Sequence, residues 1–122
     1  MSQIKIEFEK ISIEADLNNS ETANKIKKVL PISSFINTWG DEIYFAIDVD
    51  DPEIDSKEVV ELGDIAYWPP GNAFCIFFGL TPASENGDIR PASPVNVIGK
   101  ILGNLEILKS VKSGEKVSIS LI

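Results

Sequence analysis

The turn Trp68-Pro69-Pro70-Gly71-Asn72 has the residue types of a small apolar binding surface. Two prolines restrict the backbone beside an indole ring, which offers a flat apolar face and one N–H donor. A rigid wall of this kind suits a small molecule or a peptide. The alternative is structural, a turn whose Trp68 ring plugs one end of the fold.

Arg90, the one arginine of the chain, is a second candidate. It lies in an aperiodic segment, residues 79–96, that is rich in Pro, Gly, Ser and Asn. A guanidinium held beside Pro91 could bind a carboxylate through two parallel N–H donors. The alternative is an internal ion pair with one of the 19 acidic residues, which would pin the loop.

The turn Trp39-Gly40-Asp41-Glu42 is a third candidate, with a structural role as its main alternative. Asp41, Glu42 and Asp64 are the carboxylates expected nearest the rim of a barrel. Paired carboxylates can perform acid–base chemistry, but no spacing brings two of these together, so no catalytic residue is assigned. The candidate ligand-binding residues are Trp68, Pro69, Pro70, Asn72, Phe77, Phe78, Arg90 and Asn96.

The chain contains no histidine and a single cysteine. Histidine-based zinc sites and Ser–His–Asp or Cys–His nucleophiles are therefore excluded, as are Cys₄ sites and internal disulfides. Cys75 lies in the apolar run 74–78, which predicts a buried, unreactive thiol. The acidic stretch 48–55 does not match a calcium-binding EF-hand loop and is predicted to be solvated. No metal and no cofactor are expected.

The formal net charge of −8 repels phosphate groups, so nucleic acid and anionic membranes are not expected partners. No apolar run approaches the ~20 residues that span a bilayer. Apolar and polar residues alternate from Ile4 without a signal-like segment, which predicts a cytoplasmic protein. The expected partner is an unidentified small molecule or peptide, and the residues leave open whether the protein is a monomer or a homodimer.

Alternating apolar residues predict strands at 4–8 and 11–17, with a turn at Glu9-Lys10. Asn18-Asn19-Ser20 caps a helix over about 20–30, which Pro31 ends. Two hairpins are expected, 35–47 around Gly40-Asp41 and 59–68 around Gly63-Asp64. Further strands are expected at 73–78, buried on both faces, and at 95–102, 105–108 and 117–121. One helix among many short strands indicates a mainly β barrel or sandwich, with residues 1–122 as one domain.

Three motifs carry a resemblance to a known family: NTWGDEIYF at 37–45, GDIAYWPPGNAFCIFFG at 63–79 and RPASPVNVIGKILG at 90–103. With them the chain resembles the small prokaryotic proteins called cyclophilin-like, most of which are functionally uncharacterised. The resemblance covers nearly the whole chain. It implies a closed antiparallel barrel of about eight strands, with the helix packed against one end.

The resemblance does not extend to the active site of the cyclophilins themselves, which are prolyl isomerases. Their aromatic–His–Arg and Gln-Gly-Gly motifs are absent, and Arg90 lies in a proline-rich loop. We therefore expect a non-catalytic module that binds a small molecule or peptide beside Trp68 and Arg90. The alternatives are an unconventional prolyl isomerase that uses Arg90 to weaken amide resonance, and a protein-interaction module.

Overall fold

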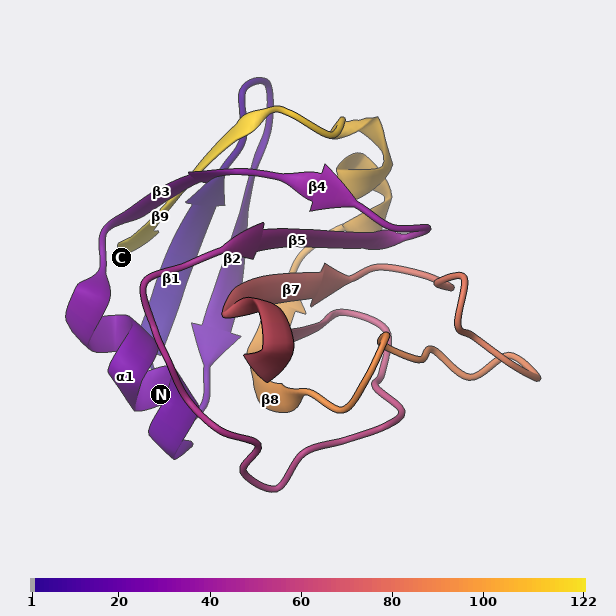
Figure 1. The fold of residues 1–122 in the computed structure, drawn as a ribbon. Coiled ribbons are helices and arrows are strands. Elements are labelled where there is room, and N and C mark those ends of the chain that lie inside the picture. Colours follow the sequence, from indigo (N-terminus) through magenta and orange to yellow (C-terminus); the bar gives the residue numbers. More distant parts are fainter. Residues whose placement is uncertain (1) are drawn as a thin grey trace.

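Nine strands, all paired antiparallel, form one sheet in the computed structural model, which describes residues 2–122 (Figure 1). The sheet rolls into a nearly closed barrel with one α-helix. The strands are β1 (Ser2–Glu7), β2 (Ser12–Leu17), β3 (Ile32–Phe35), β4 (Asn37–Thr38), β5 (Glu42–Ala46), β6 (Asp64–Trp68), β7 (Ala73–Phe77), β8 (Asn96–Leu102) and β9 (Lys116–Leu121). The helices are α1 (Glu21–Val29) and two 3₁₀ turns, η1 (Pro69–Gly71) and η2 (Leu105–Ser110).

The two edges of the sheet are consecutive in the chain. The strand order is β3-β9-β1-β2-β8-β6-β7-β5-β4, and only Ile36 separates β3 from β4. The Ser34 hydroxyl on β3 donates a hydrogen bond to the carbonyl of Ala46 on β5, at 3.0 Å. The predicted barrel is therefore confirmed. It has nine strands rather than about eight because residues 32–38 form two short strands with different partners.

The longer strands send alternate side chains into the barrel, where Phe45 and Phe74 stack with their ring centres 5.2 Å apart. Strand β7 is buried on both faces, as predicted. Its outward face belongs to a second apolar cluster on the outside of the sheet. This outer cluster is made of Val60, Ala66, Ala73, Cys75, Phe77 and Val95.

The helix forms where the sequence predicts it. The Ser20 hydroxyl accepts the Ala23 N–H at 3.3 Å and caps the first turn. The helix ends at Val29, before Pro31, and buries Ile26 completely. No helix within residues 2–122 is long and apolar enough to cross a membrane.

Three local predictions are wrong. Residues 105–108 form the 3₁₀ turn η2 instead of a strand, because the Asn104 side chain accepts the Glu106 N–H at 3.0 Å and starts a helical turn. Residues 59–62 form no strand and make a single bridge, between Val60 and Ile89. The acidic stretch is not wholly solvated either, since Asp51 is buried.

Candidate functional site

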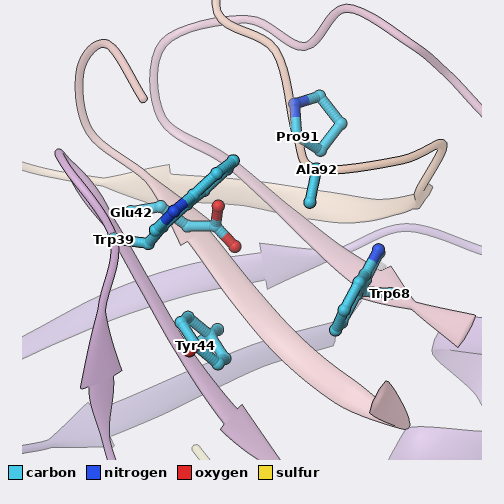
Figure 2. Close-up of a pocket in the computed structure, with 6 residues that line it drawn as sticks. All are labelled: Trp39, Glu42, Tyr44, Trp68, Pro91 and Ala92. Atoms are coloured by element: carbon cyan, nitrogen blue, oxygen red, sulfur yellow. The ribbon is translucent and has the colours of Figure 1, made fainter. Parts of the chain in front are cut away.

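A cavity of about 260 Å³ lies against the outer cluster (Figure 2). The indole rings of Trp39 and Trp68 stand on its opposite sides, and the Glu42 carboxylate points into the space between them. Its lining residues are Trp39, Glu42, Tyr44, Trp68, Pro91 and Ala92. Three aromatic rings and one carboxyl group therefore face one small space.

The alternation of strand β5 places Glu42 and Tyr44 on the outside of the barrel, while Ile43 and Phe45 point inward. Glu42 pairs with Phe77 of β7, and Tyr44 pairs with Cys75. The floor of the cavity is therefore the outer face of the β5–β7 pair.

The β4–β5 turn brings Trp39 next to Glu42. The two residues exchange backbone hydrogen bonds, Trp39 N–H to the Glu42 carbonyl at 2.9 Å and Glu42 N–H to the Trp39 carbonyl at 3.2 Å. Gly40 in this turn has a φ of +60°, and a Cβ there would lie 2.9 Å from the Leu80 carbonyl oxygen. The turn thus requires glycine, because the loop 79–95 packs directly on it.

Trp68 ends strand β6 and forms the opposite wall. Its indole N–H donates to the Ser93 hydroxyl at 2.7 Å, so this donor is already used within the protein. The 3₁₀ turn η1 folds against the ring, and a Cβ on Gly71 would lie only 2.6 Å from an indole carbon. The sequence prediction of a rigid indole wall agrees with this geometry. The one N–H donor of that wall is bound to Ser93.

Polar side chains hold the loop that carries Pro91 and Ala92. The Ser84 hydroxyl accepts the N–H groups of Thr81 and Arg90, at 2.9 and 3.2 Å. The Thr81 hydroxyl donates to the Arg90 carbonyl. Backbone bonds between Lys57 and Val95 fasten the end of the loop, at 2.8 and 3.0 Å. The wall that Pro91 and Ala92 form therefore belongs to a loop that hydrogen bonds hold in place, although the loop has no regular secondary structure.

Glu42 is the electrostatically unusual residue of the cavity. The residue is 6% exposed, and no Lys or Arg in residues 2–122 forms an ion pair with it. Burial raises the pKa of its carboxyl from 4.5 to about 7, while the neighbouring Cys75 thiol, a potential donor, acts in the opposite direction. Near neutral pH this carboxyl therefore exists in both protonation states.

Cys75 is 1% exposed, as the sequence predicts. Burial raises the pKa of its thiol well above 9.0, and the charge of Glu42 adds to the effect. The thiol therefore remains protonated at neutral pH, which agrees with the prediction that it is unreactive.

The other predicted site residues are spread around the cavity or away from it. Phe77 lies beneath it in the outer cluster, whereas Phe78 packs in the barrel core. Pro69 and Pro70 form η1 behind the Trp68 ring, and Asn72 ends that turn in a left-handed conformation. None of these five side chains lines the cavity.

Asn96 serves the interior of the protein. Its amide nitrogen donates to the Thr22 hydroxyl at 3.1 Å and to the Pro52 carbonyl at 2.9 Å, and its oxygen accepts the Ile54 N–H at 3.0 Å. These bonds attach the acidic stretch to β8. No hydrogen-bonding capacity of the side chain is directed toward the cavity.

Arg90 lies in a neighbouring hollow that Pro91 and Ala92 separate from the cavity. Its guanidinium approaches Asp88 at 3.4 Å, a weak and partly exposed contact. Its Nε is buried without a partner among residues 2–122. The side chain is thus neither a strong internal anchor nor part of the aromatic site.

The sequence names Trp39 and Glu42 in its third candidate turn, for which it favours a structural role, and it does not single out Tyr44. The available signal was the alternation of Glu42 and Tyr44 on the face opposite Ile43 and Phe45. That face would normally contact solvent, and only the packing of the loop 79–95 turns it into a cavity floor.

No group of three or more His, Cys, Asp or Glu side chains in the described part of the chain could hold a metal ion. In the acidic stretch, the Asp51 carboxylate is engaged instead by the Lys25 ammonium at 2.5 Å and the Thr22 hydroxyl at 2.6 Å.

Comparison with known proteins agrees with the fold. A family model described as cyclophilin-like matches residues 2–120. The solution structure of a hypothetical protein, AF2241 from Archaeoglobus fulgidus, is 48% identical and superimposes with a TM-score of 0.84. The match covers 99% of this chain and 95% of the archaeal one. No curated protein matches.

Proposed function

The chain belongs to the cyclophilin-like family, and we propose that it is a non-catalytic binding module whose site is the cavity between Trp39 and Trp68. The carrying observation is the buried Glu42 carboxyl, which forms no ion pair within residues 2–122 and faces a small space walled by three aromatic rings. A few convergent polar groups in an apolar hollow are typical of ligand sites.

The dimensions limit what can bind. Pockets for drug-sized molecules occupy about 300–1,000 Å³, and this cavity of about 260 Å³ is slightly smaller. It therefore suits a small molecule, or one side chain or head group of a larger one.

The geometry favours binding over catalysis. Among residues 2–122, Glu42 is the only carboxyl or amine that lines the cavity, so these residues assemble no acid–base pair there. The prolyl isomerase alternative depends on Arg90, which lies beyond the wall formed by Pro91 and Ala92. A peptide isomerisation assay tests this alternative, and clear acceleration by the protein would overturn the non-catalytic proposal.

The two tryptophans of the chain both line the cavity, so indole fluorescence reports directly on the site. A small-molecule library is screened for a change in this fluorescence together with a rise in Tm, because a ligand of the native state stabilises it. We expect Ala92→Phe, which fills the cavity from its wall, to abolish both signals. Leu80→Phe, at an exposed position of the same loop outside the cavity, serves as the matched control.

Binding that survives Ala92→Phe would place the site elsewhere. A library that leaves both the fluorescence and the Tm unchanged would contradict the proposed function itself.

A further inference from the structure

The cavity combines a buried acid with aromatic walls, and no residue that lines it carries a positive charge. Ionised Glu42 is therefore a desolvated anion without a counter-ion, an arrangement that is unfavourable unless something compensates the charge. The net charge of −8 makes the whole molecule attractive to cations. Both facts point to a positively charged occupant.

We propose that the cavity binds the head group of an organic cation, an alkylated ammonium, which pairs with Glu42 and packs against the rings of Trp39, Tyr44 and Trp68. This inference rests on the proposed function and specifies its ligand class. The faces of aromatic rings attract cations, tryptophan most strongly. Figure 2 shows the two indoles on opposite sides of the space into which the carboxylate points.

The hydrogen-bonding groups of the site favour an alkylated ammonium over a primary one. A primary ammonium carries three N–H donors that need acceptors, whereas the lining offers one carboxylate and the Tyr44 phenol. The Trp68 N–H is itself a donor and is already bound to Ser93. A metal ion is disfavoured for the same reason, since calcium takes about 6–8 oxygen ligands.

Binding of a cation must be coupled to the protonation of Glu42. Burial raises the pKa of this carboxyl to about 7, so at lower pH the cation has to displace a proton. The Cys75 thiol, also raised in pKa, stays protonated over this range. Asp41 and Tyr44 flank Glu42 in the chain, and Asp64 begins strand β6 on the far side of β7, where Lys100 pairs with it at 3.2 Å.

The test compares choline with dimethylbutanol, the neutral analogue in which a carbon atom replaces the choline nitrogen, by titration of the indole fluorescence. We expect choline to bind at least about tenfold more tightly, because only the cation gains the ion pair and the aromatic attraction. Its affinity should rise at least about tenfold between about pH 5 and pH 8, with a proton released on binding at the lower pH.

Glu42→Gln keeps the shape of the side chain and removes its charge. We expect it to lower the choline affinity at least about tenfold at about pH 8 and to abolish the pH dependence. Glu14→Gln, an exposed position on β2, is the control and should change neither. Trp39→Leu should weaken binding more than Trp39→Phe, since phenylalanine keeps an aromatic face. Trp68 remains as the reporter in both variants.

The outcomes separate the inference from the proposed function. Equal affinity for choline and dimethylbutanol would refute the cation while leaving a ligand site. Binding of library ligands in the cavity, together with no binding of choline, tetramethylammonium or a trimethyl-lysine peptide, would also refute the cation and leave a ligand site. A site that binds nothing refutes both proposals. Tighter binding of the trimethyl-lysine peptide than of choline would support the inference and identify the source as a protein side chain, and the reverse order would identify a free small molecule.

Discussion

Glu42 and Arg90 show how much the surroundings of one charged side chain decide. Glu42 lies in a short polar turn of the sequence, yet it is 6% exposed and has no cationic partner in the described chain. Arg90 is the one arginine of an acidic chain, yet its contact with Asp88 is long and partly exposed. Arg90 therefore lies outside the candidate cavity, whereas Glu42, from the third candidate turn, lines it.

The pKa of Glu42 predicts a pH-dependent stability. Because its folded-state pKa of about 7 exceeds the ordinary value of 4.5, the folded state binds more protons between these values. The free energy of unfolding should fall as pH rises through this window. Glu42→Gln should remove this fall and be more stable than the wild type at about pH 8, by about 1–3 kcal/mol. Urea unfolding at several pH values measures the difference, and a less stable variant at about pH 8 would show that the carboxylate has a partner.

The weak pairing of Arg90 predicts a small effect of its removal. Arg90→Ala should lower the free energy of unfolding by less than about 1.5 kcal/mol, as expected for surface changes. Asp88→Ala, which removes the other partner, should behave similarly. Denaturant unfolding is the measurement. A fall in the free energy of unfolding on the order of 3–5 kcal/mol would instead identify a buried charge pair that holds the loop in place.

At the scale of elements, the acidic stretch between β5 and β6 is attached to the fold by its buried member. The Asp51 carboxylate accepts hydrogen bonds from Lys25 and Thr22 of helix α1. The Tyr67 hydroxyl of β6 donates to the Val49 carbonyl at 2.6 Å and accepts the Asp51 N–H at 3.2 Å. One aspartate therefore joins the helix, the long connection and the sheet.

This attachment predicts both a mutational and a pH effect. Burial alone raises the pKa of Asp51, but the hydrogen bonds of Lys25 and Thr22 and the charge of Lys25 lower it below 3.8. Its stabilisation should therefore be present at neutral pH and be lost as pH falls below about 4. Asp51→Asn should lower the free energy of unfolding at neutral pH by about 1–3 kcal/mol.

The exposed neighbour Asp50 provides the control. Asp50→Asn should leave the unfolding transition nearly unchanged, and the difference between the two variants should shrink in acid. Equal effects of both substitutions at neutral pH would show that the contacts of Asp51 contribute little.

At the scale of the whole molecule, the barrel supplies two separate apolar layers. One fills its interior, and the outer cluster lies between the sheet and the loop 79–95. Strand β7 packs against both layers, so none of its side chains faces solvent. The cavity lies at the edge of the outer layer, where a rigid sheet positions its floor and a hydrogen-bonded loop positions its wall.

A fold held by two apolar layers should not need a metal ion. Dialysis against a chelator should leave the Tm unchanged, because the described chain has no cluster of metal-ligating side chains and the Asp51 carboxylate is already paired. Differential scanning calorimetry before and after dialysis measures this. A large drop in Tm that calcium restores would indicate an oxygen-ligand site in residues 48–55 after all.

Local patterns in the sequence were sufficient to predict much of the fold. The alternation of Ile4 and Ile6 with polar residues, the Ser20 cap and the apolar run of β7 are each patterns of residues close together in the sequence, and each prediction is confirmed. The tertiary structure decided which candidate residues share one cavity: Trp39, Glu42 and Trp68 line it, and Arg90 does not. Glu42 acquires its burial from a loop some 50 residues away in sequence, whose Pro91 no local pattern places over β5. Periodicity reports which face of a strand is apolar, whereas the environment of a carboxyl group depends on every segment that folds over it.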